Sequence, residues 1–199
     1  MNDNTLELIC TRLSHDIVGN IGAVANAVEL LEDGDLDFLE DIKLILKSSS
    51  QTLSARLKFF RMTFGLENSN IRDNELVKIT AQNYLNTLGN KDYPINLLFN
   101  VVDSRKIKAS LMMLMIVADL LIRGGDITIK EEGAKIVAEI SSLLKISADK
   151  LEKVKNTLYC SDINPDAGMA PLIVLLKTYP NANTFLSIDD NYIRLIMEN

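Results

Sequence analysis

The amino-terminal third of the chain places an apolar residue at every third or fourth position, which is the period of one helix face. The side chains Asp3, Asn4 and Thr5 can cap the start of a helix, and Gly34 can end it. We therefore expect one long amphipathic helix between them, with its apolar stripe on Leu6, Ile9, Leu13, Ile17, Ile21, Val24, Val28 and Leu31.

A second stretch continues the same periodicity for some thirty residues after the Asp33–Gly34–Asp35 turn. The short connection predicts an antiparallel helical hairpin. Two helices alone cannot bury wide apolar faces, so a second copy completing a four-helix bundle, a homodimer, is expected. The alternative is that the carboxy-terminal part of the same chain covers the hairpin. The second stripe comprises Leu36, Leu39, Ile42, Ile45 or Leu46, Ser49, Leu53, Leu57, Phe60 and Phe64.

The rest of the chain mixes helical and strand patterns beyond a polar linker, residues 68–74. Helices are expected at 74–88, with Leu76, Ile79, Tyr84 and Leu88 as core, and at 107–122, 147–158 and 170–179. Strands are expected at 94–102, 126–130, 134–140, 184–188 and 192–197. The fold class is thus α+β, with a helical-hairpin domain at 1–67 and an α/β sandwich domain at 68–199.

Composition narrows the function classes. The 199 residues are 47% hydrophobic, which is ordinary for a globular protein, and the net charge of −6 argues against nucleic acid as a partner. No basic amino-terminal region precedes an apolar run, so neither export nor a membrane anchor is expected. Cys10 and Cys160 lie far apart and fit a reducing cytoplasm, where they stay free thiols.

His15 is the chain's one histidine, and it lies within the first predicted helix. At about 100° per residue it lies roughly 160° from Leu13, away from the apolar stripe. Two glycines share its face although each costs a helix about 1 kcal/mol relative to alanine, so we expect that they give a partner access to the imidazole. The residues on this face are Leu8, Thr11, Gly19, Gly22 and Asn26.

Several chemistries of a lone histidine are disfavoured. A metal site would need further ligands, and neither a second histidine nor a ligand-spaced cysteine cluster is present. A serine hydrolase would need a nucleophile elbow of the G-x-S-x-G kind, which the sequence lacks. The remaining role is a histidine that is itself the nucleophile and forms a covalent intermediate at a ring nitrogen.

Three segments together, RLSHDIVGNIGAVANAVELLE, SARLKFFRMTFG and IRGGDITI, resemble bacterial histidine phosphotransferases of the ChpT type. These proteins are similar to the dimerisation and ATPase halves of sensor histidine kinases. The resemblance implies a phosphorelay in which a phosphohistidine shuttles a phosphoryl group between receiver-domain aspartates. One departure is Asn20, where the family often has proline; this change should leave a straighter helix.

The resemblance also raises the question of ATP. The kinase helix that corresponds to residues 107–122 carries asparagines that hold Mg²⁺, and here Met113 and Val117 fall at those positions. Neither side chain offers a hard oxygen ligand, and no G-x-G lid occurs among the nine glycines. We expect a degenerate domain that uses no ATP and holds no metal, with Mg²⁺ on the partner receiver domain.

The implied site centres on His15 as phosphoacceptor. Asp16 is a possible orienting base, and Arg12 can meet the phosphoryl oxygens or pair with Asp16. The partners are response-regulator receiver domains, with the donor on a hybrid histidine kinase and the acceptors on response regulators. Their docking surface is expected to comprise Leu8, an apolar outlier on the polar face, with Thr11, Arg12, Gly19, Gly22 and Asn26.

Two other functions stay open at this stage. The chain can be a binding module without catalysis, which docks a signalling partner and in which His15 has no role. It can also be an ATP-dependent histidine kinase with an unusual nucleotide site.

Overall fold

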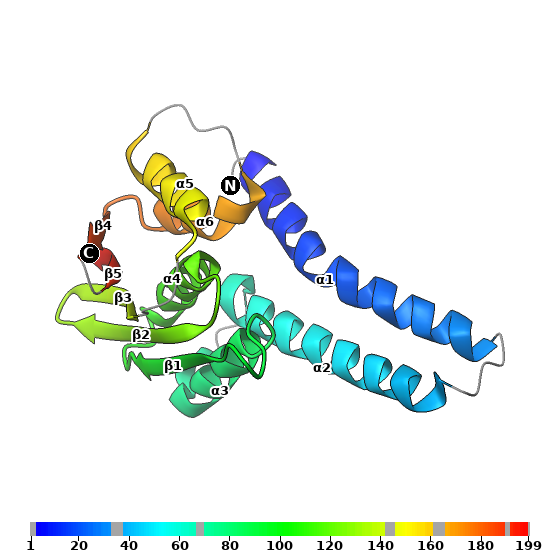
Figure 1. The fold of residues 1–199 in the computed structure, drawn as a ribbon. Helices are drawn as coiled ribbons and strands as arrows, with labels where there is room; N and C mark the ends of the chain where they lie inside the picture. The colour runs from blue at the N-terminus through cyan, green and yellow to red at the C-terminus, as the bar shows by residue number, and fades with distance from the viewer. Residues whose placement is uncertain are drawn as a thin grey trace.

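The computed structural model describes residues 3–32, 38–66, 70–141, 146–160, 166–189 and 192–198. The fold is mixed α+β, as the sequence predicts. Two long helices, α1 (Asp3–Glu32) and α2 (Leu39–Phe64), lie side by side and run in opposite directions, with the remaining helices and a five-stranded sheet gathered at one end of them (Figure 1). We call this the near end of the helix pair, and the opposite end the far end.

Both long helices predicted from the apolar period are present. The expected amino-terminal cap is wrong at Thr5, because this residue lies inside α1 and is buried. Its hydroxyl accepts a hydrogen bond from Lys177 of α6 (Ala170–Thr178), which connects the start of α1 to the last turn of α6. The predicted turn at Asp33–Gly34–Asp35 lies outside the described residues.

The sheet has the strand order β1-β2-β3-β5-β4. Its strands are β1 (Ile95–Asn100), β2 (Gly125–Glu132), β3 (Lys135–Ser141), β4 (Asn183–Ile188) and β5 (Ile193–Glu198). Strands β1 and β2 are parallel, and α4 (Ile107–Leu120) connects them; the other neighbouring pairs are antiparallel. All five strands match the predicted positions to within a few residues.

Gly124 makes the turn from α4 into β2 possible. Its φ of 58° is one that side chains disfavour, and a Cβ atom there would come within 2.4 Å of the Pro94 carbonyl oxygen. Gly124 therefore has a structural role in this turn.

Four shorter α-helices accompany α1 and α2 in the described part of the chain. Apart from Lys108 and Asp119, every residue of α4 is buried. Ser147 caps α5 (Ala148–Tyr159), because its hydroxyl accepts a hydrogen bond from the amide of Lys150 at 3.3 Å. No helix within the described ranges is long and apolar enough to cross a membrane.

The predicted core of α3 (Asn74–Leu85) needs correction. Leu76, Ile79 and Leu88 are exposed, and of the expected core residues only Tyr84 is buried. The helix packs against both α2 and β1, which turns a neighbouring stripe inward. That buried stripe consists of Val77, Thr80, Ala81, Tyr84 and Leu85.

One hydrophobic cluster joins the near end of the helix pair to the sheet and its helices. Phe59 of α2 is fully buried there and stacks on Tyr84 of α3, with ring centroids 4.0 Å apart and planes 7° apart. The far end projects away from this cluster (Figure 1). The domain boundary predicted between residues 67 and 68 lies outside the described residues.

Candidate functional site

His15 lies in the middle of α1, and its side chain is 85% exposed. The glycines one and two turns further along the helix, Gly19 and Gly22, also face open space, since a Cβ atom at either would meet nothing within 4 Å. The imidazole therefore stands in solvent beside bare helix backbone, where another molecule can approach it closely.

The carboxylate of Asp16 lies beside the ring but is itself only 13% exposed. Its Oδ1 is 3.5 Å from Nδ1 of His15, at the outer limit of a hydrogen bond. Its Oδ2 accepts a hydrogen bond from Nε of Arg12, one turn earlier, at 2.8 Å. One oxygen is thus held inside the protein while the other faces the exposed ring.

Arg12 points inward, and its side chain is 11% exposed. Its two terminal nitrogens form a fork on Asp119 of α4, at 2.6 Å from Nη1 to Oδ2 and 3.1 Å from Nη2 to Oδ1. Nη1 also lies 3.4 Å from the carbonyl oxygen of Gly168. Burial opposes the charge of Arg12, but the hydrogen bond and the charge of Asp119, together with Asp16, outweigh it and raise the pKa of Arg12 above its usual value.

A second arginine, Arg56 of α2, links α1 to the turn that follows α3. Its guanidinium donates to the backbone carbonyl of Asp16. It also donates from Nε to the hydroxyl of Thr87 at 3.1 Å and from Nη2 to the Thr87 carbonyl at 3.2 Å. The helix turn that carries His15 is therefore fixed from two sides, by Arg56 at the backbone and by Arg12 at the Asp16 side chain.

Tyr84 lies next to these ionic contacts. Its hydroxyl is buried and has no hydrogen-bond partner among the described residues. Burial, with a smaller contribution from the charge of Asp119, raises the pKa of Tyr84, so the phenol stays protonated. Tyr84, which stacks on Phe59, thus lies close to the charges of Asp119, Arg12 and Asp16.

The residues predicted to dock a partner do not all lie on the surface. Thr11, Gly19, Gly22 and Asn26 are exposed on the His15 side of α1. Leu8, the expected apolar outlier, is instead half-buried. Arg12 pairs with Asp16, which is one of the two roles expected for it. The pair is nearly buried, however, because Asp119 binds the guanidinium inside the protein.

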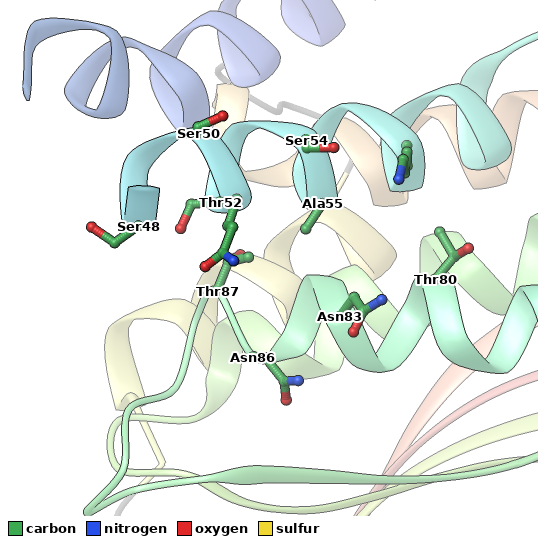
Figure 2. A pocket seen from close by; sticks show the side chains of 11 residues that line it. Ser48, Ser50, Thr52, Ser54, Ala55, Thr80, Asn83, Asn86 and Thr87 are labelled. Atoms are coloured by element: carbon green, nitrogen blue, oxygen red, sulfur yellow. The ribbon is translucent and has the colours of Figure 1, made fainter. Parts of the chain in front are cut away.

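A polar hollow of about 680 Å³ is lined by residues of α2, of α3 and of the turn after α3 (Figure 2). Hydroxyl and amide side chains line most of it, including Ser48 and Thr52 from α2 and Asn83 from α3. Its lining includes Thr87, which accepts a hydrogen bond from Arg56. Arg56 also donates to the Asp16 carbonyl, so this one side chain connects the hollow to the His15 turn.

The positions compared with kinase metal ligands lie inside the protein. Met113 and Val117 of α4 are fully buried in the hydrophobic cluster. Within the described part of the chain, no three His, Cys, Asp or Glu side chains are placed to hold a metal ion. Cys10 and Cys160 are exposed free thiols.

Sequence reasoning missed Asp119, Arg56 and Gly168 as neighbours of the site. A signal for Asp119 was available, because a lone carboxylate in the apolar run LMMLMIVADLL needs a partner. The partner, Arg12, lies 107 positions away, and no spacing rule connects the two.

The chain is similar in sequence to a known phosphotransferase. Over 130 residues the chain is 32% identical to the protein phosphotransferase ChpT of Brucella abortus (strain 2308), covering 64% of this chain and 60% of that protein. The chain thus matches about three fifths of the length of its curated relative. No family model matches the chain.

A solved structure of a phosphotransferase has a similar fold. A 1.7 Å structure of a bacterial phosphotransferase superimposes with a TM-score of 0.77 at 25% identity, covering 100% of this chain and 97% of that one. A histidine kinase from Burkholderia phymatum STM815 gives a TM-score of only 0.35 at 10% identity, covering 94% and 97%, and carries no weight. The relative and the 1.7 Å structure together confirm the resemblance to phosphotransferases of the ChpT type that the motifs around His15 indicate.

Proposed function

We propose that the chain is a histidine phosphotransferase, which carries a phosphoryl group between receiver-domain aspartates as a phosphohistidine on His15. The observation that carries the proposal is an imidazole that is 85% exposed beside a carboxylate held in place by buried ionic contacts. The similarity to ChpT supports the same activity. We place the protein in the cytoplasm, where its exposed thiols stay reduced.

The transfer follows from the two ring nitrogens. Nδ1 faces Asp16 and keeps its proton, which leaves the lone pair on Nε2 free. Nε2 attacks the phosphorus of the receiver's aspartyl phosphate, a P–N bond forms, and the P–O bond breaks with its electron pair on the leaving carboxylate. The ring becomes positive, and Asp16 stabilises that charge. The reverse sequence with a second receiver returns the phosphoryl group to an aspartate.

We propose that this chain needs neither nucleotide nor a metal of its own. Met113 and Val117 point into the core and offer no hard oxygen ligand. Charge neutralisation by Mg²⁺ is assigned to the receiver domain, which brings its own acidic site. Positioning is what this chain contributes to the transfer.

Receiver domains dock, in this proposal, on the exposed side of α1 around His15. Thr11, Gly22 and Asn26 are exposed on the same side of α1 as the imidazole, and the glycine offers no side chain to obstruct a partner. The donor is expected on a hybrid histidine kinase and the acceptors on response regulators, so one surface serves both.

We also infer that α1 and α2 form a hairpin that a second copy completes to a four-helix bundle. Ile21 and Val28 of α1 are 51% and 42% exposed, and Leu57 of α2 is 48% exposed. A single chain leaves these apolar side chains in water, since its sheet and shorter helices cover only the near end.

The apolar side chains and His15 lie on opposite faces of the helix pair. Ala27 of α1 is buried, and α2 runs beside α1 (Figure 1), so we take Ala27 to mark the direction of contact with α2. At about 100° per residue, Ile21 and Val28 lie roughly 100–120° to one side of it and His15 roughly 120° to the other. On antiparallel α2, Leu57 falls on the Ile21 face. A dimer through this face leaves both imidazoles accessible.

The test is transfer of radiolabelled phosphate from phosphorylated receiver domains to the purified protein, beside His15→Ala and an ATP-only control. We expect acid-labile label on the wild type, dependent on the receiver, and none on His15→Ala. Absence of label with several receivers favours a non-catalytic docking module instead. Label from ATP alone would show an ATP-dependent kinase.

A further inference from the structure

We infer that Asp119, which reaches α1 from the sheet-bearing half of the protein, is a positioning residue for the transfer on His15. The inference rests on the proposed function, and it adds a residue that acts through Arg12 and Asp16 without touching the phosphoryl group. Four side chains contact one another in series: the Asp119 carboxylate binds the Arg12 guanidinium, Arg12 binds Asp16, and Asp16 lies beside the His15 ring.

The division of the Arg12 nitrogens is the central observation. Each terminal nitrogen donates to one oxygen of Asp119, at 2.6 and 3.1 Å, which fixes the orientation of the guanidinium, and Asp16 receives a hydrogen bond from Nε alone. An arginine that was free to turn would offer one edge with two N–H groups to Asp16 and take both of its oxygens. Because Asp119 holds the fork, Oδ1 of Asp16 stays available to the ring.

Charge leads to the same result. Asp119 and Asp16 carry two negative charges against the one positive charge of Arg12, and all three side chains are at most 14% exposed. Asp119 therefore offsets the charge of Arg12, and the Asp16 carboxylate faces the Nδ1 side of the ring, while the guanidinium of Arg56 binds the Asp16 backbone carbonyl. Without the Asp119 charge, Arg12 would cancel that of Asp16, and the ring would lose the preference for a proton on Nδ1.

The sheet-bearing half of the protein would thus take part in the transfer by positioning Arg12, although the proposed transfer uses no nucleotide. Asp119 is the one acidic residue in α4, a helix otherwise buried apart from Lys108. The Gly168 carbonyl adds a second contact to Arg12 from the short helix before α6. The rotation of α1 at the His15 turn is thus set by the same core that holds the sheet.

The first experiment reads the ring itself and needs no phosphoryl donor. As the one histidine in the chain, His15 gives an unambiguous imidazole signal in ¹⁵N NMR. We expect the neutral ring of the wild type to carry its proton on Nδ1 and Asp119→Asn to shift it toward Nε2. Arg12→Lys, which keeps the charge but has no fork, should produce the same shift, and Asp119→Glu should restore part of the wild-type form.

The second experiment is a double-mutant cycle on transfer from a phosphorylated receiver. Asp119→Asn should lower kcat by roughly tenfold to a hundredfold and leave KM for the receiver unchanged, since misplacement affects the reacting geometry. In the Asp16→Asn background the same substitution should have no further effect, because its route to the ring is gone. Glu139→Gln, which breaks a comparable ion pair with Arg194 in the sheet, is the matched control and should transfer normally.

The outcomes separate the two proposals. A wild type that transfers, with an Asp119→Asn variant of equal kcat and unchanged tautomer, overturns the positioning role and leaves the proposed function intact. An equal loss in the Asp16→Asn background also overturns it and assigns Asp119 a purely structural role. If Asp119→Asn does not fold, Arg12→Lys and the wild-type tautomer decide, and a wild-type ring protonated on Nε2 refutes the inference.

Discussion

The two ends of the helix pair are built from similar amphipathic sequence yet are stabilised differently. At the near end, Ile9, Phe59 and Phe60 are buried in a core shared with the sheet and its helices. At the far end, Ile21, Val28 and similar side chains remain exposed in the single chain. The comparison shows that one end is completed by the chain itself, whereas the other has an apolar face left for a second surface. His15 lies between them.

The largest effect is expected from Phe59→Ala, which empties a fully buried site at the near end. It should lower the free energy of unfolding by about 3–5 kcal/mol, through lost burial and the cavity that remains. The matched truncation Phe38→Ala, at the far end where the ring is 54% exposed, should cost less than about 1 kcal/mol. Urea denaturation measures both. Equal losses would mean that the two ends do not differ.

The next effect concerns association. Ile21→Glu combined with Val28→Glu should weaken a homodimer by roughly a hundredfold or more, because each apolar side chain withdrawn removes about 1.5 kcal/mol. Sedimentation equilibrium measures the change. The control carries the same added charge on the His15 side of α1, as Thr11→Glu with Asn26→Glu, and should dimerise normally. A dimer that is indifferent to the first pair contradicts the proposed face.

The smallest stability effect is expected at Gly22, where a bulky residue should nevertheless block docking. Gly22→Ala should raise the free energy of unfolding by about 1 kcal/mol and leave transfer intact, since a Cβ atom there meets open space. Gly22→Phe should stay folded and transfer phosphate more than tenfold more slowly, because its ring occupies the docking surface. Thermal melts and labelling time courses report the two quantities. Normal transfer by folded Gly22→Phe would exclude this surface.

Periodicity predicted most elements of the fold, because helices and strands with one buried face impose their own spacing on apolar residues. It failed on α3, where Leu76 and Ile79 satisfy a helical period as well as Val77 and Ala81 do. Which of two adjacent stripes turns inward depends on what packs against the helix, here α2 and β1. A single sequence does not contain that information.

The candidate site was predictable to a different extent. His15 and Asp16 were found because a lone histidine on the polar side of a helix is conspicuous, and family motifs surround it. The inward turn of Arg12 was not predictable, because local spacing allows both a surface pair with Asp16 and an exposed guanidinium. Asp119 decides between them, and its contact with Arg12 spans 107 positions.

That span has a consequence for how the protein is made. At a synthesis rate of about 5–20 residues per second, the ribosome takes roughly 5–20 s to deliver Asp119 after Arg12. Throughout that interval α1 has neither its buried ion pair nor the core that covers Ile9. The nascent amino-terminal helices therefore emerge as amphipathic segments with their apolar faces exposed. Segments that are synthesised later, including α4, then cover the near end of those faces and pair with Arg12.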